Sequence, residues 1–184
     1  QSSAISPIDG EIKADNLKFI NDTNKNKILL TRNAKIKIFS DNKEKFSLSI
    51  PFGSRVFFKD NEMVKANQIL ADWDPYTLPI IAENDGFIKY VDLKQGVSFR
   101  ETVDDTTGIS SKIVIDWSQN QKSKNFKPAI NIINSNKENP NDEDVLNYPM
   151  SIDTILSVED GNEVKAGQVI ARIPKESSKT KDIT

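Results

Sequence analysis

Cysteine and histidine are both absent from this sequence of 184 residues. Without cysteine the chain cannot form a disulfide framework, and without either residue it lacks the ligands of the common zinc sites. General acid–base or nucleophilic catalysis centred on His or Cys is excluded for the same reason, so catalysis would have to use carboxylates, lysine or hydroxyls. These remaining residue types form no catalytic constellation in the sequence, and no acidic stretch has the spacing of an EF-hand calcium loop. We therefore predict that the chain has no active site of its own, and no cofactor or metal site.

Long apolar runs and an excess of one charge are missing as well. No stretch approaches the roughly 20 apolar residues that are needed to span a bilayer. The 25 basic and 27 acidic residues leave a net charge of −2, whereas a dedicated nucleic-acid-binding protein usually has a basic excess. The N-terminal residues 1–4 (QSSA) lack a Met and the features of a signal peptide, so we expect an excised segment of a cytoplasmic protein.

What the sequence does contain is a series of short runs with β-strand character, separated by Gly, Asn and Asp turns. Residues 35–39 and 45–50 alternate polar and apolar side chains, as half-buried strands do, and residues 40–44 read as the turn between them. No long window favours a helix. Strands of this length and spacing predict an all-β fold of the barrel or sandwich type. Further strands are predicted at 28–31, 87–91, 111–115, 129–133 and 154–158.

An internal repeat divides the chain into two parts. Residues 64–71 (VKANQILA) return as residues 164–171 (VKAGQVIA), and each copy follows an acidic turn. Asp9 also has a counterpart in Asp85, but at a smaller sequence offset, so the second copy must contain insertions. We place these around residues 117–127 and 139–148. The predicted domains are two tandem units, residues 5–76 and 78–175, with connections at 1–4 and 176–184.

Two positions in each copy should adopt a positive φ angle. Gly161 and Gly167 in the second copy lie where tight turns are expected, and glycine has no Cβ to oppose that conformation. Asn61 and Asn67 replace them in the first copy, and Asn is among the residues that best tolerate it.

The turn-and-strand pattern at the end of each copy resembles that of biotinyl and lipoyl carrier domains. Such domains present one lysine at the tip of a hairpin, shortly after the Gln-aliphatic-aliphatic-Ala strand. Thr77 occupies that place in the first copy, and neither a Met-Lys-Met nor an Asp-Lys-Ala motif is present. Lys175 comes close in the second copy, but it follows Pro174. A carrier domain that lacks its lysine is one alternative, and a generic protein-binding β domain is another.

Longer, irregular motifs indicate a specific family. Residues 72–80 (DWDPYTLPI), 106–111 (TTGISS), 171–177 (ARIPKES) and 180–184 (TKDIT) resemble the lineage-specific insertion in the trigger loop of proteobacterial DNA-directed RNA polymerase β′ subunits. The resemblance extends over essentially the whole chain. Asn61 and Asn67 depart from it, since glycines are common at those positions.

This resemblance implies two sandwich–barrel hybrid motifs and a regulatory role in transcription, without a catalytic group. The parent protein would be a nucleotidyltransferase whose magnesium and zinc lie outside the insertion. The implied partners are other parts of β′ and the other polymerase subunits, with DNA and RNA reached only through the parent complex. No membrane is involved, and we expect the fragment to be monomeric.

A few side chains are candidates for contacts or chemistry. Asp72 and Asp74 form a carboxylate pair by spacing, but they read more simply as a solvated loop after a strand. Trp73 follows an apolar run and is expected to pack partly into the core. The better contact candidates belong to the polar insertion. Trp117 is one, because Trp is favoured at interface hot spots. Lys122, Lys124 and Lys127 form a small basic cluster near Phe126 that is a candidate for contact with nucleic acid, but it reads more simply as a solvated loop.

Overall fold

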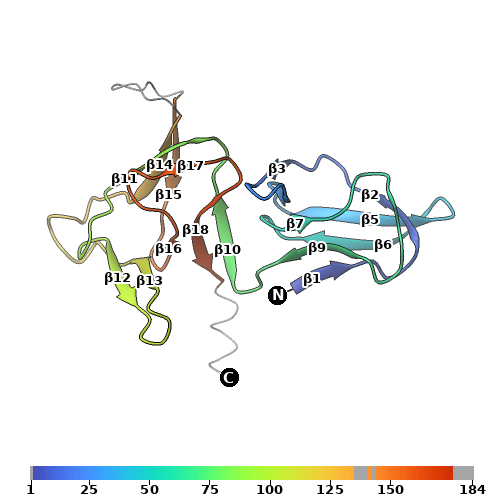
Figure 1. Ribbon diagram of the computed structural model, residues 1–184, viewed down its shortest axis with the longest axis horizontal. Coiled ribbons are helices and arrows are strands. Elements are labelled where there is room, and N and C mark those ends of the chain that lie inside the picture. The colour runs from blue at the N-terminus through green and yellow to red at the C-terminus, as the bar shows by residue number, and fades with distance from the viewer. Residues whose placement is uncertain (1, 135–140, 142–143, 176–184) are drawn as a thin grey trace. The chain divides into compact units, whose positions relative to one another are not determined.

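The computed structural model describes residues 2–134, 141 and 144–175, and its regular structure consists of β-strands (Figure 1). The all-β prediction is confirmed. No helix in this described part of the chain is long and apolar enough to cross a membrane. The chain divides into two compact units, Gln1–Leu78 and Pro79–Thr184.

The first unit is built from two antiparallel sheets. Its strands are β1 (Ser2–Ile5), β2 (Gly10–Lys13), β3 (Phe19–Asn21), β4 (Lys27–Leu29), β5 (Ala34–Ser40), β6 (Lys43–Ile50), β7 (Arg55–Val56), β8 (Met63–Val64) and β9 (Ile69–Trp73). The strand order is β1-β9-β7-β4-β3 in one sheet and β6-β5-β2-β8 in the other.

The second unit repeats this topology strand for strand. Its strands are β10 (Thr77–Ile81), β11 (Gly86–Val91), β12 (Phe99–Val103), β13 (Ser110–Val114), β14 (Ala129–Ile133), β15 (Val145–Pro149), β16 (Ile155–Leu156), β17 (Glu163–Val164) and β18 (Val169–Pro174). The orders β10-β18-β16-β13-β12 and β15-β14-β11-β17 match those of the first unit, element by element. The repeat seen in the sequence is therefore a repeat of the whole fold, in keeping with a pair of sandwich–barrel hybrid motifs.

The repeated Asp residues hold equivalent turns in the two units. Asp9 Oδ1 accepts a hydrogen bond from the backbone N–H of Ala66 at 2.7 Å. Asp85 Oδ1 accepts one from Ala166 at 2.8 Å in the same place of the second unit. Each bond ties the start of the opening strand to the VKA turn, because a carboxylate readily satisfies a backbone donor that lacks a partner in a sheet.

The four predicted positive φ angles are all present. Asn61 and Asn67 have φ values of 66° and 71°, and Gly161 and Gly167 have values of 89° and 91°. The turns of the two units are thus the same in geometry, and only the residue that occupies each turn has changed.

Each unit buries its own apolar core. Ile36, Ile38 and Leu70 lie at the centre of the first core, and Ile130 and Ile132 at the centre of the second. On β5 the alternation of buried isoleucines with exposed lysines leaves one face of the strand on the core and the other in solvent. Trp73 packs against the first core and Trp117 against the second.

Three details of the predicted strands need correction. The turn predicted at residues 40–44 consists only of Asp41 and Asn42, with φ values of 53° and 62°, as in the tight two-residue turns that match strand twist. The strand predicted at 154–158 is reduced to β16. Residues 145–148 of the predicted insertion belong to β15, the counterpart of β6. Apart from Asn141 and Asp144, the remainder of that insertion lies outside the described residues, as does the predicted connection at 176–184.

Candidate functional site

The predicted contact residues lie on one long connection, residues 116–128, between β13 and β14; we call it the contact loop. Ser123 is buried inside it, and its Oγ donates a hydrogen bond to the backbone oxygen of Trp117 at 2.7 Å. The backbone N–H of Phe126 donates to the backbone oxygen of Ser123 at 2.9 Å. Hydrogen bonds between its own polar groups therefore order the contact loop, which contributes few apolar side chains to a core.

Asp116 fixes the start of the contact loop. Its Oδ1 accepts hydrogen bonds from Ser118 N at 2.9 Å and Ser118 Oγ at 2.6 Å, and its Oδ2 accepts one from Gln119 Nε2 at 3.0 Å. These bonds lower the pKa of the Asp116 carboxyl, because they stabilise the charged form. Trp117 follows directly and is half-buried, with its ring against the core of the second unit.

The lysines of the contact loop are exposed. Lys122, Lys124 and Lys127 all lie at the surface, and none of them forms an ion pair with another described residue. The backbone N–H of Lys127 donates to Asp92 Oδ2 at 2.9 Å, which joins the end of the loop to the end of β11. Lys94 adds a fourth cation, with its Nζ 5.6 Å from the centre of the Phe126 ring.

Sequence reasoning missed Lys94 and Asp92 because both are distant from the contact loop in sequence. Asp92 lies in a turn at the end of β11, with a φ of 52°, and no local sequence pattern connects it or Lys94 to the contact loop. The contact loop can present positive charge and part of an aromatic ring to an acidic partner. Whether Trp117, Lys122, Lys124 and Lys127 make that contact stays a prediction.

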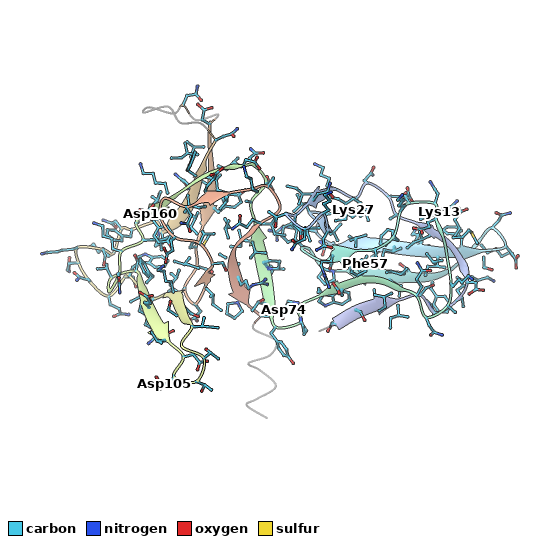
Figure 2. All side chains as sticks on the ribbon, in the orientation of Figure 1. Lys13, Lys27, Phe57, Asp74, Asp105 and Asp160 are labelled. Carbon is cyan, nitrogen blue, oxygen red and sulfur yellow. The ribbon has the colours of Figure 1, made fainter. Side chains whose placement is uncertain are left out.

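Asp72 and Asp74 are the candidate carboxylate pair, but in the structure the two carboxylates have different hydrogen-bond partners. Asp72 lies within β9 rather than in a loop, and Arg55 on β7 binds it through two hydrogen bonds of 2.8 and 2.6 Å. The hydrogen bonds between Arg55 and Asp72 raise the pKa of the Arg55 guanidinium. Asp74 accepts hydrogen bonds from Tyr76 N at 2.8 Å and Thr77 Oγ1 at 2.7 Å, in the segment that joins β9 to β10 (Figure 2).

Thr77 is the residue at the place of a carrier lysine, and it does not lie at a hairpin tip. β9 and β10 belong to different sheets, so residues 74–76 connect the two units instead of turning back on one sheet. The acidic residues Asp104 and Asp105 are exposed, and Asp105 lies at the tip of the β12–β13 hairpin (Figure 2). Among the described residues no group of three or more acidic side chains is placed to hold a metal ion.

Tyr90 is the ionisable group that the fold perturbs most clearly. Burial raises its pKa to about 12, and the nearby charges of Glu159 and Asp160 add to the effect. The phenol donates a hydrogen bond to the backbone oxygen of Val158, and its ring meets Phe99 edge-on with centroids 5.8 Å apart. These contacts give Tyr90 a packing role beneath the acidic turn.

The chain resembles known proteins along its entire length. The DNA-directed RNA polymerase subunit β′ of Ehrlichia ruminantium (strain Gardel) is 41% identical over 186 aligned residues, and that of Ehrlichia chaffeensis (strain Arkansas) is 39% identical over 186. In both cases the alignment covers 100% of this chain and 13% of the relative, so the chain spans about an eighth of the length of the curated relatives it matches. No protein-family model matches the chain.

Proposed function

Because the chain belongs, as a segment, to the family of DNA-directed RNA polymerase β′ subunits, we propose that it is a non-catalytic module that such a subunit carries in its trigger loop. The identity over the whole chain is the observation that carries the proposal. The position in the trigger loop is inferred from the resemblance of residues 72–80 and 171–177 to that insertion.

The module would act by biasing a conformational equilibrium. In this family the trigger loop alternates between an open form and a folded form that closes over the incoming nucleotide, and closure of this kind can limit the rate. A module attached to the loop moves with it, so a contact made in only one of the two positions shifts their populations. Coupling energies of ~1–3 kcal/mol would change the closed population by roughly 5- to 150-fold. Nucleotide addition, pausing and transcript cleavage would all respond.

The contact loop supplies one surface for such a state-dependent contact. Its lysines are exposed while hydrogen bonds within the loop hold its backbone, so ordering the backbone adds little to the entropic cost of binding a partner. The partners would be other parts of β′ and the other subunits of a cytoplasmic polymerase. With a net charge of −2, the module would reach DNA and RNA only through the assembled enzyme.

The proposal is tested in the intact polymerase by deleting Ser3 through Lys181 and joining the loop with a short linker. We expect single-nucleotide addition to continue, with altered pause lifetimes and transcript cleavage. Complete loss of catalysis would mean that the segment holds an essential group, and unchanged rates and pauses would mean that the segment is passive.

A finer variant tests the contact loop alone. Replacing Lys122, Lys124 and Lys127 with Ala in the intact subunit should reproduce part of the pausing change. The matched control removes three exposed lysines of the first unit instead, and it should leave pausing as in the unmodified enzyme. These control lysines are Lys43, Lys59 and Lys65.

A further inference from the structure

The first unit carries several hollows that residues of the sheet β6-β5-β2-β8 line in part. One of them has a volume of about 710 Å³, and its lining includes Arg32, Lys35, Phe52 and Trp73, with Leu78 at the start of β10. A second hollow of about 310 Å³ adjoins it, because Asn33 and Lys35 line both. We call the larger one the Arg32 hollow.

The Arg32 hollow combines positive charge with aromatic surface. The Arg32 guanidinium carbon lies 5.4 Å from the centre of the Phe52 ring, a distance at which a cation is attracted to the ring face. No acidic residue lines the hollow. Among the described residues neither Arg32 nor Lys35 forms an ion pair, so both charges remain available to a ligand.

The neighbouring lysines differ, because their charges are already matched. Lys13 lies 3.5 Å from Glu11, and Lys37 lies 3.3 Å from Glu44. Lys43 and Lys45 on β6 are also exposed, and neither forms an ion pair among the described residues. The Arg32 hollow differs from them because its two unmatched cations lie beside aromatic rings.

The second unit shows that the fold does not require this surface. Register places Ala129 at the position equivalent to Lys35, and it is buried opposite Pro149. Asn131 takes the position equivalent to Lys37, and its Oδ1 accepts a hydrogen bond from Asn147 Nδ2 at 2.7 Å. The repeated fold therefore does not require a lysine at either position, and the second unit lacks the counterpart of Lys35.

We propose that the Arg32 hollow binds an acidic protein segment that also carries apolar side chains. Arg32 and Lys35 would pair with carboxylates of the segment, and the exposed parts of the Phe52 and Trp73 rings would receive its apolar residues. A nucleic-acid strand fits less well, because it needs cations repeated along the phosphate backbone. A further hollow at the sheet β6-β5-β2-β8 is lined instead by acids, among them Asp9, Glu11 and Asp41.

The test uses the 184-residue chain with Trp117 replaced by Phe, so that Trp73 is the single tryptophan and reports from the hollow itself. The probe is a short synthetic peptide in which Asp and Glu alternate with Leu, Phe and Ser. We expect a change in Trp73 emission that saturates, with a dissociation constant below about 100 µM at low salt that weakens as salt is added. No saturable change with this probe overturns the proposal.

The double variant Arg32→Ala/Lys35→Ala should bind the peptide about tenfold more weakly, since two exposed charge pairs are lost. Both residues are exposed, so the fold should be retained. The matched control, Lys59→Ala/Lys65→Ala, removes two exposed lysines of the same unit that do not line the hollow. An equal loss in the control would reveal a non-specific charge effect and overturn the proposal.

Two further probes separate the classes of ligand. The same peptide with Lys in place of each acid should not bind. A single-stranded oligothymidylate of equal length should bind more weakly than the acidic peptide, and tighter binding that depends on Arg32 and Lys35 would replace the proposal with a nucleic-acid site. Binding is measured on the isolated 184-residue chain, so these results do not depend on whether the chain lies in a trigger loop. Peptide binding at the Arg32 hollow and the trigger-loop position can therefore each be refuted without the other.

Discussion

Gly10 and Gly86 occupy equivalent positions in the two units, and at both positions the paired strand leaves no room for a Cβ atom. We expect substitution of either glycine to destabilise the fold. A Cβ on Gly10 would lie 2.5 Å from the backbone oxygen of Phe39 and 2.8 Å from Ile38 Cγ2. A Cβ on Gly86 would lie 2.5 Å from the backbone oxygen of Ile133. The obstacle in both cases is a backbone atom of a paired strand, so it cannot rotate away. Forcing an extra methyl group into such a site typically costs about 1–3 kcal/mol, and we expect Gly10→Ala and Gly86→Ala each to cost about 3 kcal/mol.

The two tryptophans allow each unit to be observed separately. Trp73 packs against the core of the first unit and Trp117 against that of the second, and the chain contains no other tryptophan. In a Trp117→Phe background, urea unfolding followed by Trp73 emission should show the loss caused by Gly10→Ala. In a Trp73→Phe background, Trp117 emission should show the loss caused by Gly86→Ala.

Gly108→Ala is the matched control for this prediction. Gly108 has a φ of +71°, and a Cβ there would meet nothing within 4 Å, so only backbone strain of about 1–2 kcal/mol is expected. The reasoning would be refuted if Gly86→Ala left the free energy of unfolding unchanged, or if Gly108→Ala cost more than Gly86→Ala.

Three further predictions concern pH, an ion pair and covalent modification. Tyr90 has a folded-state pKa of about 12 against an ordinary value of 10.0, so the phenol stays neutral in the folded chain while it ionises in the unfolded one. The free energy of unfolding should therefore fall as pH rises through this window, by roughly 1–2 kcal/mol once solvent screening of the half-buried ring is allowed for. Unfolding titrations at both ends of the window should show a smaller fall in Tyr90→Phe; an identical fall in the variant would count against the assignment. Replacing Arg55 with Lys removes one of two hydrogen bonds to the largely buried Asp72 carboxylate and should cost about 0.5–1 kcal/mol, less at high salt, as measured by urea unfolding. A cost that salt did not change would mean that packing, not charge, is lost. Intact-mass spectrometry after expression with biotin and lipoate should show the unmodified mass, because Thr77 stands where a carrier lysine would be; a mass shift matching either group would restore the carrier hypothesis.

The repeat and its special turns could be predicted from the sequence because they depend on local chemistry. The VKA turns need a residue that tolerates a positive φ, and Asn67 and Gly167 satisfy that need in equivalent places. The alternation along β5 could likewise be read directly, since one face of a half-buried strand must be apolar.

Other features could not be predicted because they depend on contacts between distant parts of the chain. β3 has only three residues, and β15 begins directly after a polar stretch, so neither has a distinct local pattern. The Arg32 hollow brings Arg32 together with Phe52 and Trp73, and Lys94 reaches Phe126 across an intervening hairpin. No spacing rule relates such residues until the pairing of the strands is known.

The two candidate surfaces arise from the same connection of the repeated fold. In the first unit residues 30–33 join β4 to β5 and carry Arg32, and in the second the contact loop joins β13 to β14 and carries Lys122, Lys124 and Lys127. In each unit this connection runs from a strand of one sheet to a strand of the other. It is a surface connection, and such connections tolerate added residues better than the strands that form the core. The short version leaves its cation beside aromatic rings at a hollow, whereas the long version forms a folded loop with exposed lysines. A partner that fits one shape would not fit the other. We therefore expect the two proposed surfaces to bind different partners, and we expect substitutions in one to leave binding at the other unchanged.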